Sequence, residues 1–285
     1  MTKKILYILI VVFFVGLFLI SFKIFKSDRL EEVEDFRIYY RDINDEILND
    51  MGNYDLVIVE GLHFNKQDVE KVKRKKDTLI LGYLSIMEIG NWDDEIIKGL
   101  YPSDYLYIDE ARVKNNKNYL GNISSEHYQD ILIESLEKRA LSKGMDGVFL
   151  DTVGTLDDYK RNDIIYNTLL SGYEQFLQKL RRNYPGIYII QNRGFEALTR
   201  VSSDYIDGVL WENFNASSVD KRESVKERID TLKILEENKK LIVFTESYEN
   251  GEENNNFTEK MGWIHFQNNS NQHSNWFQMK DNNTN

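Results

Sequence analysis

Eight short apolar runs alternate along the chain with helical patterns, and they constrain the fold more than any other feature. Most runs are apolar throughout, which is typical of strands buried on both faces of a parallel sheet. They are residues 36–40, 56–60, 79–84, 147–151, 187–191, 208–212, 241–245 and 262–266. This alternation predicts an α/β fold, namely a (β/α)8 TIM barrel in a single domain. A doubly wound open sheet is the alternative.

Apolar residues recur at helical spacing between these runs. The pattern predicts helices near residues 131–140, 165–180 and 225–235, and a short polar helix at 68–76. Two segments interrupt it. Residues 88–125 form a long connection rich in Trp, Tyr, Asn and Asp, and residues 248–260 form an Asn- and Glu-rich stretch that we expect to be a loop. Both follow the carboxyl end of a strand, where barrel enzymes carry their active sites.

Two of the runs repeat one motif. Asp146-Gly-Val-Phe-Leu-Asp151 and Asp207-Gly-Val-Leu-Trp-Glu212 both begin with Asp-Gly-Val and end in a carboxylate. We expect each Asp-Gly pair to form a turn in which Gly supplies unusual backbone angles. The terminal acid then stands where the strand leaves the core. For any single run, ordinary polar punctuation of a strand end is the alternative reading.

In a barrel, the carboxyl ends of all strands open on one face. Closure therefore brings together acids, amides and aromatic residues that no spacing in the sequence connects. The polar candidates are Glu60, Ser85, Glu88, Asp151, Thr152, Gln191, Asn192, Glu212, Asn213 and Glu246. The aromatic candidates for a cleft are Tyr39, Tyr40, Tyr83, Trp92, Trp211 and Tyr248.

Such a rim suits glycoside hydrolysis, in which one carboxylic acid protonates the leaving oxygen and a second carboxylate attacks the sugar or activates water. A Mg²⁺ or Ca²⁺ site built from the same acids is the competing chemistry. The four histidines show no paired spacing, so we expect no zinc site. The sequence also has no nucleophile-elbow motif and no phosphate-binding glycine loop. We therefore predict neither a metal nor a cofactor.

The charge of the chain excludes one class of partner. The net charge of the whole chain is -11. Residues 1–29 have a net charge of +4, so the remaining residues have a net charge of -15. This excess is a poor fit to nucleic acid, whose binding depends on basic contacts to phosphate. It suits a neutral or cationic ligand. The absence of cysteine excludes disulfides, thiolate metal sites and a lipoprotein-type anchor.

The N-terminus predicts a membrane segment. Residues 5–22 form an apolar run without charge that follows Lys3 and Lys4, an arrangement typical of a single-pass anchor with the domain outside the cytoplasm. A cleaved signal peptide, which would give a secreted protein, is the alternative. We divide the chain into a stub and anchor (1–29), a tether (30–35), the barrel (36–267) and a polar, frayed tail (268–285).

Five short segments resemble the strand-end motifs of glycoside hydrolase family 114, the endo-α-1,4-polygalactosaminidase-like family that includes the hydrolase domain of Pel-type exopolysaccharide systems. They are Gly82-Tyr-Leu-Ser-Ile-Met-Glu88, Gly147-Val-Phe-Leu-Asp151, Gln191-Asn-Arg-Gly194, Leu210-Trp-Glu-Asn213 and Thr245-Glu-Ser-Tyr248. The resemblance covers about residues 36–266. The chain departs from the family pattern at Met87, where Gly is usual, and at Gly90, where an acid is usual.

The resemblance implies a (β/α)8 fold and cleavage within α-1,4-linked galactosamine or N-acetylgalactosamine polymers, such as a Pel-like biofilm exopolysaccharide. It implies Asp151 as nucleophile and Glu212 as acid/base, with the roles exchangeable. We expect substrate contacts from Glu60, Tyr83, Ser85, Glu88, Asn192, Trp211, Glu246 and Tyr248. Candidate partners are the amino-sugar polymer, the membrane and exopolysaccharide synthase components. Two alternatives are a non-catalytic polysaccharide-binding component of an export complex and a metal-dependent hydrolase of another barrel family.

Overall fold

The computed structural model describes residues 29–91, 93–115, 117–219, 221–239, 241–270 and 273–277. The predicted membrane segment and Trp92 lie outside these residues. Within them, the search for a helix long and apolar enough to cross a bilayer finds none.

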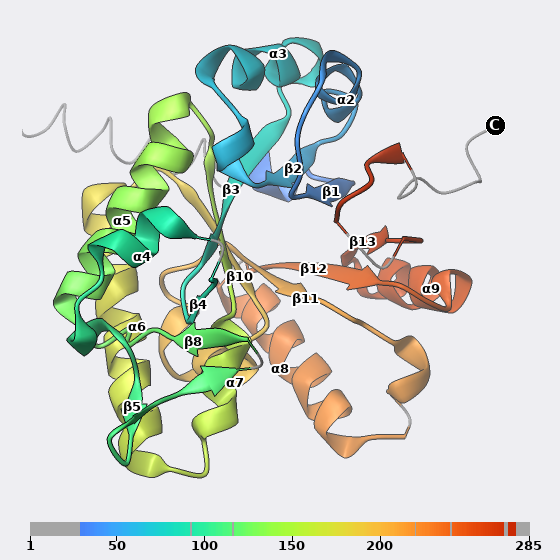
Figure 1. Ribbon diagram of the computed structural model, residues 1–285. Coiled ribbons are helices and arrows are strands. Elements are labelled where there is room, and N and C mark those ends of the chain that lie inside the picture. The colour runs from blue at the N-terminus through green and yellow to red at the C-terminus, as the bar shows by residue number, and fades with distance from the viewer. Residues whose placement is uncertain are drawn as a thin grey trace, which may run out of the picture.

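Eight parallel strands follow one another in chain order around a single sheet (Figure 1). They are β1 (Phe36–Tyr39), β2 (Leu56–Val59), β3 (Leu79–Ser85), β9 (Gly147–Asp151), β10 (Tyr188–Asn192), β11 (Gly208–Trp211), β12 (Ile242–Ser247) and β13 (Ile264–Gln267). No hydrogen-bonded ladder joins the first strand, β1, to the last, β13. The two strands are nevertheless neighbours, because the ring centroids of Phe36 and Phe266 are 5.7 Å apart. The sheet is therefore a nearly closed barrel, and its strands match the eight predicted runs to within two residues.

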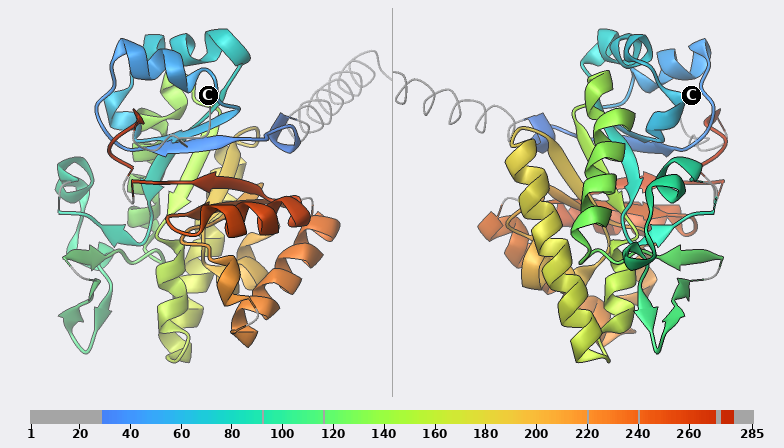
Figure 2. Two further views of the ribbon diagram at one scale, coloured as in Figure 1. Left: turned by 90° about the vertical axis from the view of Figure 1, so that its right-hand side faces the viewer. Right: turned by 60° about the vertical axis from the view of Figure 1, so that its left-hand side comes forward.

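Helices follow the strands and cover the outside of the barrel (Figure 2). They are α2 (Asp45–Met51), α3 (Lys66–Lys76), α5 (Glu126–Arg139), α6 (Asp163–Asn183), α7 (Phe195–Ala197) with a π-helical turn at Leu198–Ser202, α8 (Glu223–Lys239) and α9 (Gly251–Met261). The four helices expected from the sequence are confirmed.

Helix α9 corrects the expectation of a loop at residues 248–260. Its buried face carries two polar residues, Asn254 and Thr258, which are 0% and 1% exposed. Asn254 Oδ1 accepts a hydrogen bond from the Ala216 amide at 2.8 Å, and its Nδ2 donates to the Glu249 carbonyl at 2.7 Å. Because hydrogen bonds satisfy this inner face, the helix lacks the apolar periodicity on which sequence analysis relies.

The long connection after β3 folds into small elements of its own. It contains α4 (Asp94–Gly99), an antiparallel sheet of β4 (Glu88–Ile89), β8 (Asn118–Leu120) and β7 (Lys114–Asn115), and a hairpin of β5 (Tyr107–Ile108) and β6 (Ala111–Arg112). Figure 2 shows this insertion, in green, projecting beside α5 and α6. It leads from the carboxyl end of β3 and so borders the barrel mouth.

The side chains of each strand alternate between the barrel interior and the helix layer, as the pleat of a strand requires. Phe149 and Leu210 pack in one apolar cluster with the inward residues of the other strands. Val148 and Val209 pack in a second cluster with the surrounding helices. The inward series of β9 and β11 therefore continue, two residues later, to Asp151 and Glu212.

The glycines of the repeated motif have a different role from the expected one. Neither Gly147 nor Gly208 has a positive φ. A Cβ on Gly147 would lie 2.1 Å from the Tyr188 carbonyl oxygen, and one on Gly208 would lie 3.0 Å from the Phe244 ring. These glycines allow neighbouring strands to pack closely at the start of β9 and β11, and they do not supply the backbone angles of a turn.

The aspartates of the motif lie at the end of the barrel opposite the active site, as expected. Asp146 Oδ2 accepts a hydrogen bond from the Ile80 amide at 2.9 Å, and Asp207 Oδ2 accepts one from the Ile189 amide at 2.7 Å. Each carboxylate thus caps the start of a neighbouring strand, which satisfies a backbone donor there.

The described part of the tail, residues 268–270 and 273–277, is packed on the barrel and not frayed. Trp276 is 3% exposed and its ring lies against those of Tyr39 and Tyr54, with centroids 5.7 and 5.6 Å away. Its Nε1 donates to Asp50 Oδ2 at 2.7 Å. Burial of the indole outweighs the polar composition of the segment, and the tail lies alongside β1 at the seam of the barrel.

Candidate active site

At the ends of three adjacent strands, the same backbone conformation directs a polar side chain into the barrel mouth. Asp151 and Asn192 end β9 and β10, and Glu212 follows β11 directly. The residue after each has a positive φ: Thr152 at 64°, Arg193 at 55° and Asn213 at 62°. Left-handed backbone is rare for residues other than glycine, and strained for a β-branched residue such as Thr. It turns the chain away sharply at the point where the functional side chain faces inward.

One amide nitrogen lies between the two acids of the repeated motif. Asn192 Nδ2 donates to Asp151 Oδ1 at 2.7 Å and to Glu212 Oε2 at 3.0 Å. Because both oxygen atoms contact the same nitrogen, their separation is at most the two distances end to end, 5.7 Å. The structure thus brings together three residues that lie far apart in the sequence.

Asp151 accepts hydrogen bonds from three donors. Besides Asn192, the Tyr83 hydroxyl donates to Oδ2 at 2.9 Å and the Thr152 amide donates to Oδ1 at 2.7 Å. Burial raises the pKa of Asp151 and the charge of Glu212 raises it further, while the donors oppose these effects; the net direction is upward.

A single hydroxyl links Glu212 to a second buried acid. The Tyr248 hydroxyl lies 3.1 Å from Glu212 Oε1 and 3.4 Å from Glu246 Oε2, and it has one proton to donate. Burial and the charges of both acids raise the pKa of Tyr248, so the hydroxyl remains protonated. The shorter distance assigns the proton to Glu212.

Glu246 is 0% exposed and is held by two residues of the tail. Its Oε1 accepts from Asn268 Nδ2 at 2.9 Å and lies 2.7 Å from His273 Nε2. Burial alone would lower the pKa of His273, but the hydrogen bond to Glu246 and the charge of that acid outweigh it and raise the pKa. An ion pair therefore lies behind Tyr248.

Sequence analysis missed both tail residues. Asn268 extends the inward series of β13 beyond Ile264 and Phe266, and this two-residue period was a usable signal. His273 lies in an Asn- and Gln-rich segment that offers no periodic signal. The packing of Trp276 and a hydrogen bond from the Tyr40 amide to the His273 carbonyl oxygen, at 2.9 Å, hold it to the barrel.

Trp211 was expected in the cleft, and the structure places it elsewhere. Its ring is 6% exposed and packs against Phe195 and Phe214, with centroids 5.0 and 5.2 Å away. The strand alternation explains this, because Trp211 precedes the inward Glu212 and so must face the helices.

Glu88 and Ser85 lie near the mouth but serve the insertion. Glu88 Oε1 accepts from Asn115 at 2.8 Å, and its Oε2 accepts from Asn118 at 3.0 Å. The Ser85 hydroxyl donates to the Glu88 carbonyl oxygen at 2.7 Å. The two amide bonds join strands of the insertion to one another, and the Thr155 hydroxyl, which donates to Glu88 Oε1 at 3.2 Å, ties the insertion to the segment after β9. Neither Glu88 nor Ser85 contacts Asp151 or Glu212 through a described hydrogen bond.

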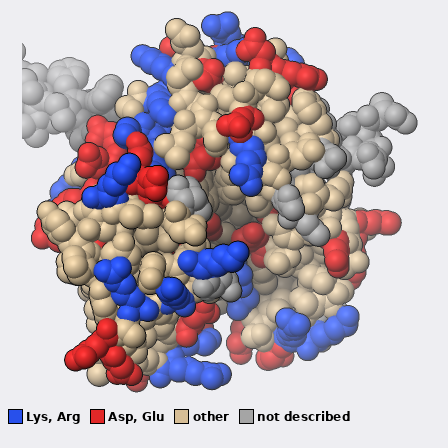
Figure 3. Space-filling model, in the orientation of Figure 1, with Lys and Arg blue, Asp and Glu red and all other residues tan. Residues whose placement is uncertain are grey.

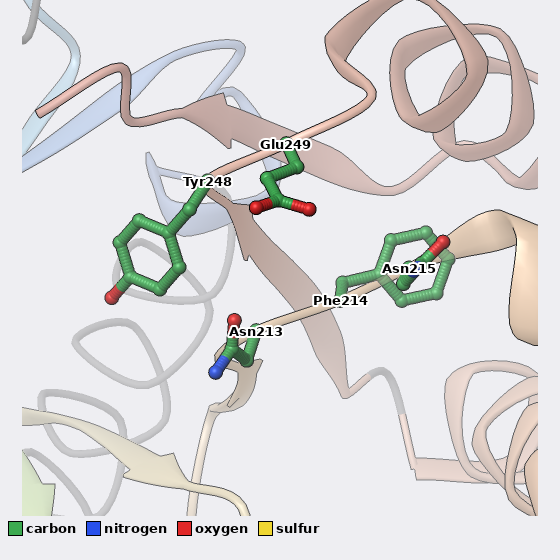
Figure 4. Close-up of a pocket in the computed structure, with 5 residues that line it drawn as sticks. All are labelled: Asn213, Phe214, Asn215, Tyr248 and Glu249. Atoms are coloured by element: carbon green, nitrogen blue, oxygen red, sulfur yellow. The ribbon is translucent and has the colours of Figure 1, made fainter. Parts of the chain in front are cut away.

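Two hollows flank the pair of acids. One, of about 450 Å³, is lined by Asn213, Phe214, Asn215, Tyr248 and Glu249 and lies on the Glu212 side (Figure 4). The other, of about 760 Å³, includes Tyr40, Glu60 and Tyr83 in its wall. Because the Tyr83 hydroxyl bonds Asp151, this second hollow lies on the Asp151 side. Figure 3 shows the face of the molecule hollowed in its middle, with both acidic and basic side chains around the hollow.

The arrangement suits proton transfer and nucleophilic attack by paired carboxylates at the floor of a groove. Among the described residues, no group of three or more His, Asp or Glu side chains is placed to hold a metal ion. The acids are instead engaged by amide, hydroxyl and imidazole donors, the surroundings expected of a two-carboxylate site.

Comparison with known proteins agrees with this geometry. The family model described as Glycoside-hydrolase family GH114 matches residues 28–283. The glycoside hydrolase domain of PelA from Pseudomonas aeruginosa superposes with a TM-score of 0.62 at 18% identity, over 82% of this chain and 94% of that chain. Aspergillus fumigatus Ega3, in a complex with galactosamine, superposes with a TM-score of 0.53 at 16% identity, over 75% and 77% of the two chains. Identities this low establish a shared fold. A search of curated protein sequences finds no match.

Proposed function

The chain belongs to glycoside-hydrolase family GH114, and we propose that it cleaves α-1,4-linked polymers of galactosamine and N-acetylgalactosamine from within. The observation that carries this proposal is the Asp151–Asn192–Glu212 arrangement at the mouth of the barrel, with a hollow on each side. Hollows on both sides allow a chain to run past the acids in both directions, as an endo-acting enzyme requires. Galactosamine is the ligand of the similar protein Ega3.

We propose a mechanism with retention of configuration. Carboxyl groups about 5–5.5 Å apart are typical of retaining glycosidases, whereas inverting enzymes need about 6.5–9.5 Å to admit a water. The limit of 5.7 Å between Asp151 Oδ1 and Glu212 Oε2 supports the retaining class.

In the first step, Glu212 donates its proton to the glycosidic oxygen while an Asp151 oxygen attacks the anomeric carbon. The bond from that carbon to the glycosidic oxygen breaks, and the leaving chain departs with the proton as a free hydroxyl. In the second step, Glu212 takes a proton from water, the water oxygen attacks the anomeric carbon, and the bond to Asp151 breaks. Both acids then return to their starting states.

Hydrogen bonding supports Asp151 as the nucleophile. Three donors stabilise its anion, whereas Glu212 accepts from two among the described residues, Asn192 and Tyr248. The upward direction of the Asp151 pKa would by itself favour Asp151 as the proton carrier. Burial outweighs the donors in this net direction, so the proposed role of Asp151 rests on the geometry of its three hydrogen bonds, and the exchange of roles with Glu212 is the alternative. The Tyr248 hydroxyl, at 3.1 Å from Glu212 Oε1, can donate a hydrogen bond to Glu212 when that residue is ionised and accept one when it is protonated.

We further propose that the enzyme works outside the cytoplasm, held by residues 5–22, on a Pel-like exopolysaccharide. The net charge of -15 beyond residue 29 supports a partly deacetylated, cationic polymer as substrate. Exopolysaccharide synthase components are candidate partners in that setting. Protease treatment of intact cells tests the location: the domain is degraded in the proposed orientation and protected in the opposite one.

Incubation of the purified protein with polygalactosamine tests the activity. We expect intermediate oligosaccharides by mass spectrometry before monosaccharide accumulates, and no shortening of polygalacturonate, which has a hydroxyl in place of the C2 amine and a carboxylate at C6. A polymer that binds but keeps its length would support the export-component hypothesis instead. Activity that a chelator abolishes would support a metal-dependent hydrolase.

A further inference from the structure

Glu60 differs from the other acids of the barrel mouth in its hydrogen bonding. Asp151, Glu212 and Glu88 each have both carboxylate oxygen atoms engaged by described donors, and Glu246 is paired with His273. Glu60 Oε1 accepts from the Leu62 amide at 3.1 Å, and Oε2 accepts no hydrogen bond from the residues that the structure describes. The residue is only 6% exposed. Oε2 is not a fully buried atom, so it remains accessible in the wall of the hollow that Glu60 lines and can accept a donor from a ligand or water.

The cations around Glu60 are committed to other partners. Arg139 donates from both terminal nitrogens to Asp93, at 2.8 and 2.6 Å. Lys143 Nζ donates to the Gly61 carbonyl oxygen at 2.7 Å. His63 Nδ1 lies 2.9 Å from Asp42 Oδ1, so this imidazole faces a different acid. His273 also lines the pocket and is paired with Glu246, whereas Arg41 is the exception, because it borders the pocket with its side chain exposed to solvent.

Glu60 lines the hollow on the Asp151 side, and the other walls suit a sugar ring. The rings of Tyr40 and Tyr83 lie together, with centroids 4.6 Å apart, and both border the hollow. Leu62, 45% exposed, adds an apolar surface at its edge. Aromatic faces pack on the apolar faces of sugars and attract cations, while a buried carboxylate selects a cationic group.

We propose that this hollow, the Glu60 pocket, binds one amino-sugar unit of the substrate chain with its free ammonium group against Glu60. The inference rests on the proposed function and specifies it further, because it makes one position next to the cleavage site selective for a deacetylated unit. An N-acetyl group in this position would present an uncharged amide to the carboxylate and would require more room. Tyr83 joins the pocket to the reaction, since its ring lines the pocket and its hydroxyl bonds Asp151.

The test compares binding of two tetrasaccharides, one of galactosamine and one of N-acetylgalactosamine, by calorimetry. An Asp151→Asn background prevents cleavage, so that the measurement reports binding alone. We expect the deacetylated ligand to bind more tightly, and Glu60→Gln to weaken its binding roughly tenfold or more while leaving the acetylated ligand almost unchanged. Glu70→Gln, an exposed acid of α3, makes the same change in net charge and serves as the matched control. An unchanged preference in Glu60→Gln would overturn the proposal.

A second variant keeps the test decisive if Glu60→Gln does not fold. Leu62→Lys places a cation at the edge of the pocket on an already exposed side chain. It should weaken binding of the deacetylated ligand and not that of the acetylated one; equal effects on both ligands would contradict the proposal. The binding assay is also independent of cleavage. If the protein binds the deacetylated ligand selectively but cleaves no polymer, the proposed function is wrong and the Glu60 pocket is supported. If it cleaves the polymer without selectivity for the deacetylated ligand, the function is supported and the Glu60 pocket is wrong.

Discussion

Asp151 and Glu212 are held apart by a single nitrogen atom, the side-chain amide of Asn192, which donates to both at 2.7 and 3.0 Å. This spacing depends on the register of three neighbouring parallel strands, where Asn192 pairs with Leu210 and Gln191 with Leu150. It thereby links the fold directly to the chemistry, because a one-residue slip would turn either acid toward the helices.

The spacing of the acids predicts the stereochemical outcome. The first product released from an α-linked galactosamine oligomer should have the α configuration, because two successive displacements restore it. Proton NMR during the first minutes of hydrolysis, before mutarotation, measures this. A β product at the earliest time point would show that water attacks directly and that Asp151 is not a nucleophile.

Loss of the Asn192 amide, which donates to both acids, should lower kcat and move its pH dependence. Asn192→Ala removes a hydrogen bond that lowers the Asp151 pKa, so that pKa should rise further. The acidic limb of the kcat profile should then move to higher pH, since Asp151 must be ionised to attack, and kcat should fall on the order of 10²-fold. A pH profile measured alongside the thermal unfolding midpoint separates this effect from misfolding. A parallel loss with no shift in pH would argue against a role for Asn192 in tuning the pair.

The ion pair between the tail and Glu246 should give a defined pH dependence of stability. The His273 pKa is raised in the folded protein above its ordinary value of 6.5, so the stabilisation is fully present below about pH 6.5 and is lost as the pH rises through the folded pKa. The difference in melting temperature between wild type and His273→Gln should therefore be largest near pH 6 and shrink toward pH 9. Glu246, Glu212 and Asp151 are the acids that face this imidazole. A difference that grows with pH would show that His273 is neutral in the folded state.

The two glycines of the repeated motif should differ in their tolerance of alanine. Gly147→Ala places a methyl group against backbone, 2.1 Å from the Tyr188 carbonyl oxygen, and should destabilise by about 3 kcal/mol or prevent folding. Gly208→Ala meets the Phe244 ring at 3.0 Å and the Ile242 carbonyl oxygen at 3.1 Å, and shifts of a few tenths of an ångström relieve both contacts, so we expect about 1 kcal/mol. Urea unfolding of both variants measures the difference. Equal costs would mean that the glycines serve backbone conformation and not close packing.

The sequence predicts the barrel and the central acids because both follow from local periods. Apolar runs of strand length identify the eight strands, and the parallel register then sends every strand-end acid to one face. The same two-residue period would have excluded Trp211, since a strand cannot direct both Trp211 and Glu212 inward. It would also have included Asn268 as the continuation of β13.

Other parts of the site depend on contacts that no local period encodes. His273 reaches Glu246 because the tail is held to β1, more than two hundred residues away in the chain, by the burial of Trp276 against Tyr39 and by the Tyr40 amide. The sequence does not indicate helix α9, because its inner face carries Asn254 and Thr258, whose hydrogen bonds are satisfied inside the protein. The left-handed conformations at Thr152, Arg193 and Asn213 are likewise invisible in sequence, because none of these positions is a glycine.

The most direct test of the central claim is the rate of oligosaccharide release from polygalactosamine by Asp151→Ala and Glu212→Ala, compared with wild type. Each variant should lose activity by at least about 10³-fold, and the double variant should lose little more, because the two acids act as a unit. Circular dichroism should show all three proteins folded. Release by either folded variant at a rate near that of wild type would contradict the account, because the reaction would then be carried by other residues.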